Sequence, residues 1–392
     1  MSLVDKSLIT TGDMADVLKS LNLLETLKES IEKNNISDIK DAVEDLLISR
    51  INIAITGDRG PEKAMFINSL RGLSFGDEGA ALCSSTAASE ELAVFQNPKH
   101  PDFRLWDLPM ISNADSFDPE KYIERFKISR YNIVIMTFTQ TLSQNTVAVW
   151  REARSLQKEG LYFALLASEK DNEKSLEAKR QSSLEVLKAK GVTLSKVFLV
   201  HPDTLEKLDF LKLLEDIQGD LPEIRAYALL LALPTFSTKI VAQKKDAFKA
   251  LGWAAASLSG GVSAIPVPMV ASLVDTSVAV RILTKAQISL CLDNESVERL
   301  AQQRGIDSAK LKAMRTCTLS VEVSKNEVKK WLTAAERDTT TATKRLVELA
   351  MPRQARAVSH AFTVMLQAIN SAIDDMSADA ENIVALATGE SQ

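Results

Sequence analysis

The spacing of apolar side chains along the chain separates stretches of different secondary structure. Between residues 15 and 48, leucine, isoleucine and valine recur every three or four positions among charged residues. This spacing predicts amphipathic helices. A polar break at Asn35 separates two of them, and we expect Ser37 to cap the second helix, which ends at Ile48.

From residue 51 onward, short apolar runs replace the helical spacing. The first is INIAITG at 51–57, followed by a glycine-rich turn and the helix-like AMFINSL. Further strand-like runs lie at 92–95, 104–107, 131–138, 161–167 and 197–200, and helix-like stretches separate most of them, notably 143–159 and 172–190. Apolar strands that alternate with helices predict a largely parallel sheet with helices on both faces.

After Pro222 the composition changes again, because glycine and proline become rare. Between residues 276 and 388 there is one glycine and one proline, and Ala, Leu, Lys, Glu and Arg dominate. This composition predicts a helical domain. We therefore expect N-terminal helices at 1–48, an α/β domain at 49–222 and a C-terminal helical domain at 223–392. The predicted fold class is α/β plus all-α.

Two stretches of the helical part raise the question of membrane contact. Residues 250–274 carry no charge, but they include several glycines and serines together with Pro266 and Pro268, which interrupt a helix. We predict a buried helical hairpin there; the alternatives are a hairpin that inserts into lipid and a true membrane span. The lysine-rich stretch 238–249 predicts a solvent-exposed helix face, with a membrane or partner patch as the alternative.

Composition and charge exclude several classes of protein. The 392 residues carry a formal net charge of −5, which argues against a nucleic-acid binder. Three widely separated cysteines and the absence of a signal-peptide pattern predict a reducing, cytoplasmic environment. No histidine–cysteine pair has metal-ligand spacing, so we expect no zinc site.

The strongest candidate for chemistry is the turn after the first strand. A buried strand, a glycine-rich turn and a helix form the context in which the phosphate-loop pattern G-x-x-x-x-G-K-[ST] is credible. Gly57 and Lys63 match this pattern, whereas Glu62 replaces the second glycine and Ala64 replaces the Ser/Thr. The candidate nucleotide-binding residues, which we regard as vestigial, are Gly57, Asp58, Arg59, Gly60, Pro61, Glu62, Lys63, Ala64 and Asp107.

Each departure from the pattern has a physical consequence for phosphate binding. A Glu62 carboxylate about 4 Å from a phosphate charge would repel it by about 4 kcal/mol at an effective dielectric constant of about 20. Ala64 lacks the hydroxyl that ligates Mg²⁺, and Pro61 lacks a backbone N–H. Lys63 can therefore be interpreted as a phosphate ligand or as a salt-bridged relic, with Glu62 as one partner. We also consider that Glu62 itself fills the phosphate site.

Three later positions of a GTPase are also altered. Asp107 begins a D-x-x-G segment whose glycine is replaced by Met110, so that Asp107 either caps the next turn or holds a metal. The base-reading pattern N/T-K-x-D is replaced after the run 161–167 by Ala167-Ser168-Glu169 or, in a second register, by Ser-Glu-Lys-Asp at 168–171, and neither supplies Asn/Thr followed by Lys. His201 follows the last strand, where a serine-containing loop is expected. The run 84–86 (Ser-Ser-Thr) could supply a Mg²⁺ ligand or could be ordinary loop chemistry.

Several longer strings resemble one family. IAITGDRGPEKAMFINSLRGL at 53–73, RLWDLPMI at 104–111 and LPEIRAYALLLALP at 221–234 resemble the immunity-related GTPase (IRG) family of interferon-inducible, dynamin-related proteins, as does the AIPVPM turn at 264–269. The resemblance covers most of the chain. It implies a Ras-like G domain inserted into a helical domain formed by N- and C-terminal helices. It also implies a role in cell-autonomous innate immunity and the existence of nucleotide-defective relatives, called quasi-GTPases.

Two functional hypotheses follow from the altered motifs. In the first, the chain is a quasi-GTPase that acts as an interaction or regulatory protein, with no catalytic residue, metal or cofactor. Its expected partners are other IRG GTPases, regulatory proteins or a second copy of itself, with peripheral contact to internal or vacuolar membranes and none to nucleic acid. In the alternative, it is a slow GTPase that binds GTP or GDP with Mg²⁺ through non-standard residues and dimerisation.

Overall fold

The computed structural model describes residues 36–58, 60–82, 91–156, 158–192, 196–259, 271–338 and 359–389. Contacts divide the chain into two units, one spanning Ile48–Phe236 and the other formed by Ser237–Gln392 with the segment up to Leu47. Residues 223–236 thus group with the first unit, 14 residues beyond the limit of 222 expected from composition. The expected three-part division stays a prediction.

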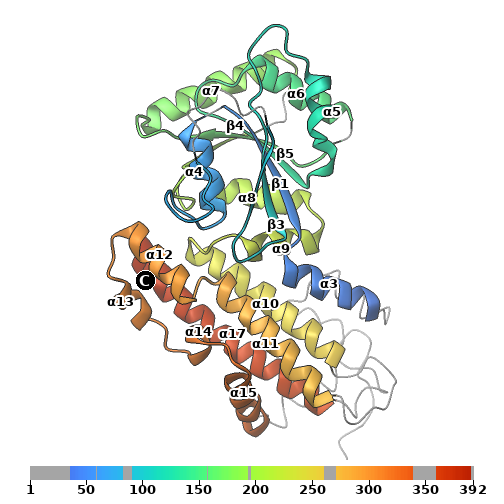
Figure 1. The fold of residues 1–392 in the computed structure, drawn as a ribbon, viewed down its shortest axis with the longest axis vertical. Helices are drawn as coiled ribbons and strands as arrows, with labels where there is room; N and C mark the ends of the chain where they lie inside the picture. Colours follow the sequence, from blue (N-terminus) through green and yellow to red (C-terminus); the bar gives the residue numbers. More distant parts are fainter. Residues whose placement is uncertain are drawn as a thin grey trace, which may run out of the picture. The chain divides into compact units, whose positions relative to one another are not determined.

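The unit Ile48–Phe236 is built on a six-stranded sheet of order β2-β3-β1-β4-β5-β6 (Figure 1). The strands are β1 (Ile51–Gly57), β2 (Ala93–Gln96), β3 (Phe103–Asp107), β4 (Ile133–Phe138), β5 (Leu161–Leu166) and β6 (Val197–Val200). Every neighbouring pair is parallel except β2 with β3, which is antiparallel. All six predicted strands are present, with ends that differ from the prediction by no more than two residues.

Helices cover both faces of this sheet, as the alternating pattern predicted. They are α4 (Pro61–Leu70), α5 (Pro119–Phe126), α6 (Gln144–Ser155), α7 (Glu173–Ala189), α8 (Phe210–Asp220) and α9 (Glu223–Ala232), with a 3₁₀ turn at Ile128–Arg130. Figure 1 shows α5, α6 and α7 on one side of the sheet and α4, α8 and α9 on the other. The predicted α/β part of the fold is confirmed.

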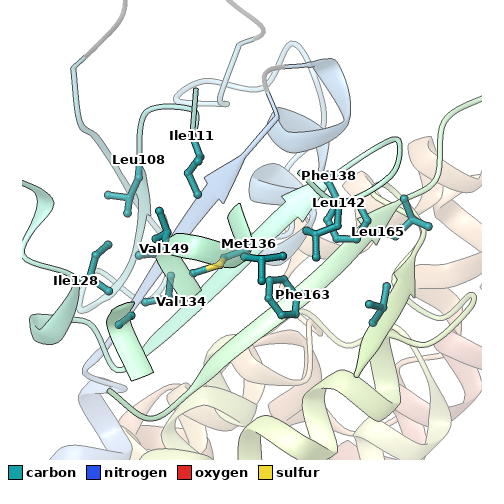
Figure 2. Close-up of a cluster of buried hydrophobic side chains, with 14 of the residues drawn as sticks. Leu108, Ile111, Ile128, Val134, Met136, Phe138, Leu142, Val149, Phe163 and Leu165 are labelled. Carbon is teal, nitrogen blue, oxygen red and sulfur yellow. The ribbon is translucent and has the colours of Figure 1, made fainter. Parts of the chain in front are cut away.

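Alternate residues of the central strands supply the cores of the two faces. Val134, Met136 and Phe138 of β4 join Phe163 and Leu165 of β5 in a buried cluster under α5, α6 and α7 (Figure 2). On the opposite face, aromatic rings stack edge to face between α4 and α8 and between α8 and the segment after α9. The two apolar faces fix the strand register, because a slip by one residue would exchange them.

The second unit is entirely helical in its described residues. Its helices are α3 (Ile36–Ile48), α10 (Thr238–Ser259), α11 (Ala271–Ser289), α12 (Asn294–Arg304), α13 (Ser308–Ala313), α14 (Thr318–Val321), α15 (Lys325–Asp338) and α17 (Ser359–Thr388). In this unit α10 lies along α11 and α17 (Figure 1). Gly252 of α10 permits a close approach to α17, because a Cβ there would lie 2.6 Å from Ile369 Cγ2.

The expected association of N-terminal and C-terminal helices is present in this unit. Arg281 of α11 donates two hydrogen bonds of 2.9 Å to the two carboxylate oxygens of Glu44 on α3. Helix α3 ends at Ile48 as predicted but begins at Ile36, so Ser37 lies inside the first turn and does not precede it. The helix expected at 15–34 lies outside the described residues.

The lysine-rich face of α10 differs from the prediction. Lys239 is exposed and Lys245 pairs with Asp374, but Lys244 is fully buried and donates a 2.6 Å hydrogen bond to Ser289 O. The prediction of a solvent-exposed helix face was therefore wrong at Lys244, which points into the bundle.

The uncharged stretch at 250–274 is only partly described. Helices α10 and α11 flank residues 260–270, which lie outside the described ranges, and the positions from Leu251 to Ala256 are buried. No helix within the described parts of the chain combines the length and the hydropathy that a membrane crossing requires.

Candidate functional site

The turn after β1 is held in a conformation that only glycine can adopt. Gly57 has φ +127°, and a Cβ on it would lie 1.7 Å from Thr137 O on the neighbouring strand β4. The next residue, Asp58, donates its backbone N–H to the same carbonyl at 3.1 Å. The Asp58 carboxylate accepts a 3.2 Å hydrogen bond from Thr139 N. The turn is therefore clamped against the carboxyl end of β4.

The amino end of α4 carries the residues that depart from the phosphate-loop pattern. Gly60 precedes the helix in an extended conformation, and Pro61 occupies its first turn. The Glu62 carboxylate folds back over Gly60, with Oε2 2.6 Å from the place that a Cβ on Gly60 would occupy. A carboxylate is favourable at this position because the amino end of a helix carries partial positive charge. Arg59, a candidate residue, lies outside the described residues.

Lys63 makes its contacts with the end of β3. Its Nζ lies 2.9 Å from Asp107 Oδ1, and their side chains are 11% and 28% exposed. The same ammonium donates a 3.3 Å hydrogen bond to Leu108 O. Lys63 thus forms its ion pair with Asp107 and not with Glu62. Asp107 accordingly binds a lysine side chain and does not cap the following turn. Next to Lys63, Ala64 is buried and offers no oxygen.

The segment after Asp107 is fixed by two hydroxyl groups. Pro109 O accepts hydrogen bonds from Thr56 Oγ1 at 3.1 Å and from Tyr122 OH at 2.7 Å. The two hydroxyl oxygens also lie 2.5 Å apart. Burial raises the pKa of the Tyr122 hydroxyl above its usual value. Met110, in place of the expected glycine, is exposed. The Pro109 carbonyl is therefore held by two protein hydroxyl groups.

Two buried polar residues of α4 and its end, Asn68 and Arg71, anchor the following loop. The Asn68 side chain accepts a hydrogen bond from Ala81 N at 2.7 Å and donates one to Ala81 O at 2.9 Å. Arg71 donates to Gly79 O at 2.8 Å and to Gln96 O at 2.9 Å. In the sequence, Asn68 and Arg71 stand out only as members of the segment 53–73 that carries the family resemblance. Their polarity within an apolar helix was the signal that could have identified them.

The loop after β5, where the sequence places both candidate registers of the base-reading pattern, packs around Asp171. Its Oδ1 accepts hydrogen bonds from Lys179 Nζ at 2.8 Å and Ser175 Oγ at 2.9 Å. Its Oδ2 accepts from Ser168 N at 3.1 Å and Ser168 Oγ at 2.8 Å. Burial alone would raise the pKa of Asp171, but the hydrogen bonds from Lys179, Ser168 and Ser175 outweigh it and hold the pKa at about 2.

The remaining sequence candidates lie apart from this edge or make local contacts. His201 Nδ1 lies 2.6 Å from Asp203 Oδ1. His100 is buried, and its backbone N–H donates a 3.2 Å hydrogen bond to Asn97 Oδ1. Cys291 and Cys317 form no disulfide among the described residues. In the same described ranges, no group of three or more potential ligands is placed to hold a metal ion. The run 84–86, Cys83 and the His360 side chain lie outside the described residues.

Comparison with known proteins gives a consistent result. A sequence model of the interferon-inducible GTPase (IIGP) family matches residues 19–384. The chain is 28% identical to interferon-inducible GTPase 5 of Bos taurus over 331 residues, which cover 80% of this chain and 70% of that protein. It is 26% identical to interferon-inducible GTPase 1 of Mus musculus over 309 residues, covering 75% and 74% of the two chains.

Among solved structures, one from a study of an oligomerised bacterial dynamin pair covers 99% of this chain and 78% of its own, at a TM-score of 0.33 and 12% identity. A similarity of that size supports no statement about this chain.

Proposed function

The chain belongs to the interferon-inducible GTPase family, and we propose that it is a nucleotide-impaired member that acts through contacts with other proteins. The observation that carries this proposal is the engagement of Lys63, whose ammonium pairs with Asp107 and hydrogen-bonds Leu108 O. In a working phosphate loop the lysine reaches the β- and γ-phosphates. Here it is bound to the end of β3.

Glu62 adds an electrostatic obstacle at the same place. Its carboxylate lies over Gly60 at the amino end of α4, where a bound phosphate would have to sit. Repulsion of about 4 kcal/mol between two unit charges about 4 Å apart corresponds to roughly a thousandfold loss of affinity. Ala64 removes the Mg²⁺ ligand that would offset this repulsion.

The intact scaffold supports a role in protein contacts. The six-stranded sheet and the helices on both of its faces are present in the described residues, whereas Glu62 and Ala64 depart from the phosphate-loop pattern. We infer that the fold serves as a docking surface for related GTPases or regulatory proteins, or for a second copy of the chain, in cell-autonomous innate immunity. Peripheral contact with internal or vacuolar membranes belongs to the same proposal.

Calorimetry with GTP, GDP and ATP in the presence of Mg²⁺ tests the nucleotide part directly. We expect no binding to the purified chain up to millimolar nucleotide. Micromolar, Mg²⁺-dependent GTP binding would refute the proposal and favour a slow GTPase that uses non-standard residues.

A loop-restoring variant tests the physical reason. Glu62→Gly/Ala64→Ser removes the repulsive charge and supplies the missing hydroxyl, so binding of nucleoside diphosphate should return at least in part. The matched control is Ala64→Ser alone, in which the Glu62 carboxylate remains and binding should stay undetectable. Equal binding by the control and the double variant would show that Glu62 is not the obstacle.

A further inference from the structure

We propose that the outer side of strand β2 is a self-association surface, at which a second copy of the chain adds its own β2 in the antiparallel direction. The inference deepens the proposed function, because it names one partner and the surface that receives it. It rests on that function only in taking the fold as a docking scaffold, and its test involves no nucleotide.

The first step is the direction in which the backbone groups of β2 point. Among the described strands, β2 lies at the end of the sheet and pairs with β3 alone. Just beyond β2, Asn97 N donates to Phe103 O at 3.0 Å in the same register. Hydrogen-bonded pairs alternate along an antiparallel ladder, so the odd-numbered residues of β2 bond to β3. The N–H and C=O groups of Val94 and Gln96 therefore point away from the sheet.

A contact of Arg71 supports this direction. Arg71 Nε donates a 2.9 Å hydrogen bond to Gln96 O, and its guanidinium lies 5.3 Å from the centroid of the Phe95 ring. Arg71 thus occupies the carboxyl end of β2. Within the part of the chain that the structure describes, the outward N–H and C=O of Val94 have no hydrogen-bond partner. Outward backbone groups of this kind are those that an added strand pairs with.

The side chains beside these backbone groups are apolar and exposed. Val94 is 42% exposed, and Leu92, just before the strand, is 37% exposed. Because side chains alternate along a strand, Leu92 and Val94 share a face with Trp106, which lies opposite Val94 on β3. Trp106 packs against the buried cluster under α5, α6 and α7. An added strand would therefore gain backbone hydrogen bonds and apolar contacts together.

The sequence of β2 suits pairing with a copy of itself. Its four residues, AVFQ, include no charged residue and no proline, which are features that protect strand edges from self-pairing. In an antiparallel pair centred on Val94, this residue and Val94 of the second copy would exchange two N–H···O hydrogen bonds. The same register sets Leu92 diagonally beside Val94 of the second copy. The exposed apolar side chains of the two copies would then cover each other.

The charges at the two ends of β2 favour the antiparallel direction. Glu91 precedes the strand, and Lys99 follows it. Antiparallel pairing brings Glu91 of each copy toward Lys99 of the other, whereas parallel pairing would bring like charges together. Because each strand is only four residues long, the contact is small. We expect a reversible dimer with a dissociation constant on the order of 10–100 μM.

Sedimentation equilibrium of the full chain, from about 1 μM to about 1 mM, tests this association. Val94→Pro removes the outward N–H but no bond between β2 and β3. By symmetry the dimer loses two hydrogen bonds, so its dissociation constant should rise at least about tenfold. The matched control is Val94→Thr, which keeps the N–H and the branched side chain and should stay within about threefold of the parent. Circular dichroism should show both variants folded.

A disulfide experiment tests the register. Val94→Cys should place the two Cα atoms about 5.5 Å apart at the centre of the pair, within the range of a disulfide. Gln96 is also exposed, but in this register the two Gln96→Cys positions lie more than about 13 Å apart and cannot be bridged. Both variants keep the three native cysteines. After mild oxidation, a non-reducing gel should show at least about tenfold more dimer for Val94→Cys.

Three results would overturn the inference. One is a chain that stays monomeric over the whole concentration range, which is also the result expected if β2 receives a strand of a different protein. Another is a Val94→Pro variant that dimerises as tightly as the parent, which would place the contact on another surface. The third is equal crosslinking of the two cysteine variants. None of these results bears on the nucleotide part of the proposed function, which calorimetry on the unmodified chain decides.

Discussion

Replacing Lys63 tests whether this residue is kept for the fold or for a phosphate. Its ammonium lies 2.9 Å from Asp107 Oδ1, and the two side chains are 11% and 28% exposed. At an effective dielectric constant of about 20, this separation corresponds to an attraction of about 6 kcal/mol, most of which is offset by the desolvation of both charges. The net contribution must therefore be estimated from the group that is left behind.

Lys63→Met leaves Asp107 without its cation and Leu108 O without its donor. Breaking a fully buried pair costs about 3–5 kcal/mol, but Asp107 is partly exposed and can be rehydrated. We therefore expect the free energy of unfolding to fall by about 2 kcal/mol. With a urea dependence of about 2 kcal/mol per molar, the midpoint should fall by about 1 M.

Urea unfolding followed by tryptophan fluorescence measures this change. Trp106 and Trp150 lie in the sheet unit, so a Trp253→Phe/Trp331→Phe background reports on that unit alone. Lys170→Met, at an exposed position, is the control and should change stability by less than about 0.5 kcal/mol. If Lys63→Met were as stable as the parent, Lys63 would have no structural role here, and its retention would point to an anionic ligand instead.

Three further changes give distinct outcomes. Gly57→Ala places a Cβ 1.7 Å from Thr137 O at φ +127°, so we expect a loss of more than about 3 kcal/mol and a chain that circular dichroism shows to be largely unfolded or insoluble. Tyr122→Phe removes the hydroxyl bound to Pro109 O, which should lower thermal stability by about 1–2 kcal/mol; an unchanged melting temperature would contradict this. Burial lowers the pKa of Lys244 to about 8 and that of Lys285 to about 7, from 10.5. The folded state then binds fewer protons than the unfolded state, so stability should rise with pH from about 7 to 10.5, and Lys285→Met should flatten that rise in urea titrations.

The elements of the sheet could be predicted closely from the sequence. β1 and β6 begin and end at the predicted residues, because a continuous apolar run between polar or glycine-rich turns is a local signal. The antiparallel direction of β2 could not be predicted, since it depends on pairing with β3 and not on the residues of β2. The helix containing Lys244 shows the opposite failure. The charged residues of this helix indicated a solvent-exposed face, but the packing of α10 within the bundle buries Lys244.

The elements that carry the candidate residues could be predicted from the sequence, but the contacts of these residues could not; their role in binding stays a prediction. The sequence located Gly57, Lys63 and Asp107, and it indicated that Glu62 would be unfavourable for phosphate. It did not predict that Lys63 would bind Asp107, because those residues are 44 positions apart and meet only when β1 and β3 pair. The contact between Lys179 and Asp171 was missed for a similar reason. Lys179 lies on α7, eight residues after Asp171, and no nucleotide motif includes a lysine at that position.

The double engagement of Thr139 has a consequence for how a partner would associate. Because its N–H and C=O are both bound, to Asp58 and to Lys179, the two loops on either side cannot rearrange independently. A protein that docks at this edge of the sheet would meet a surface that is ordered before it arrives, and little conformational entropy would be lost on association. A partner at this edge would therefore bind with a small entropic cost on the side of this chain.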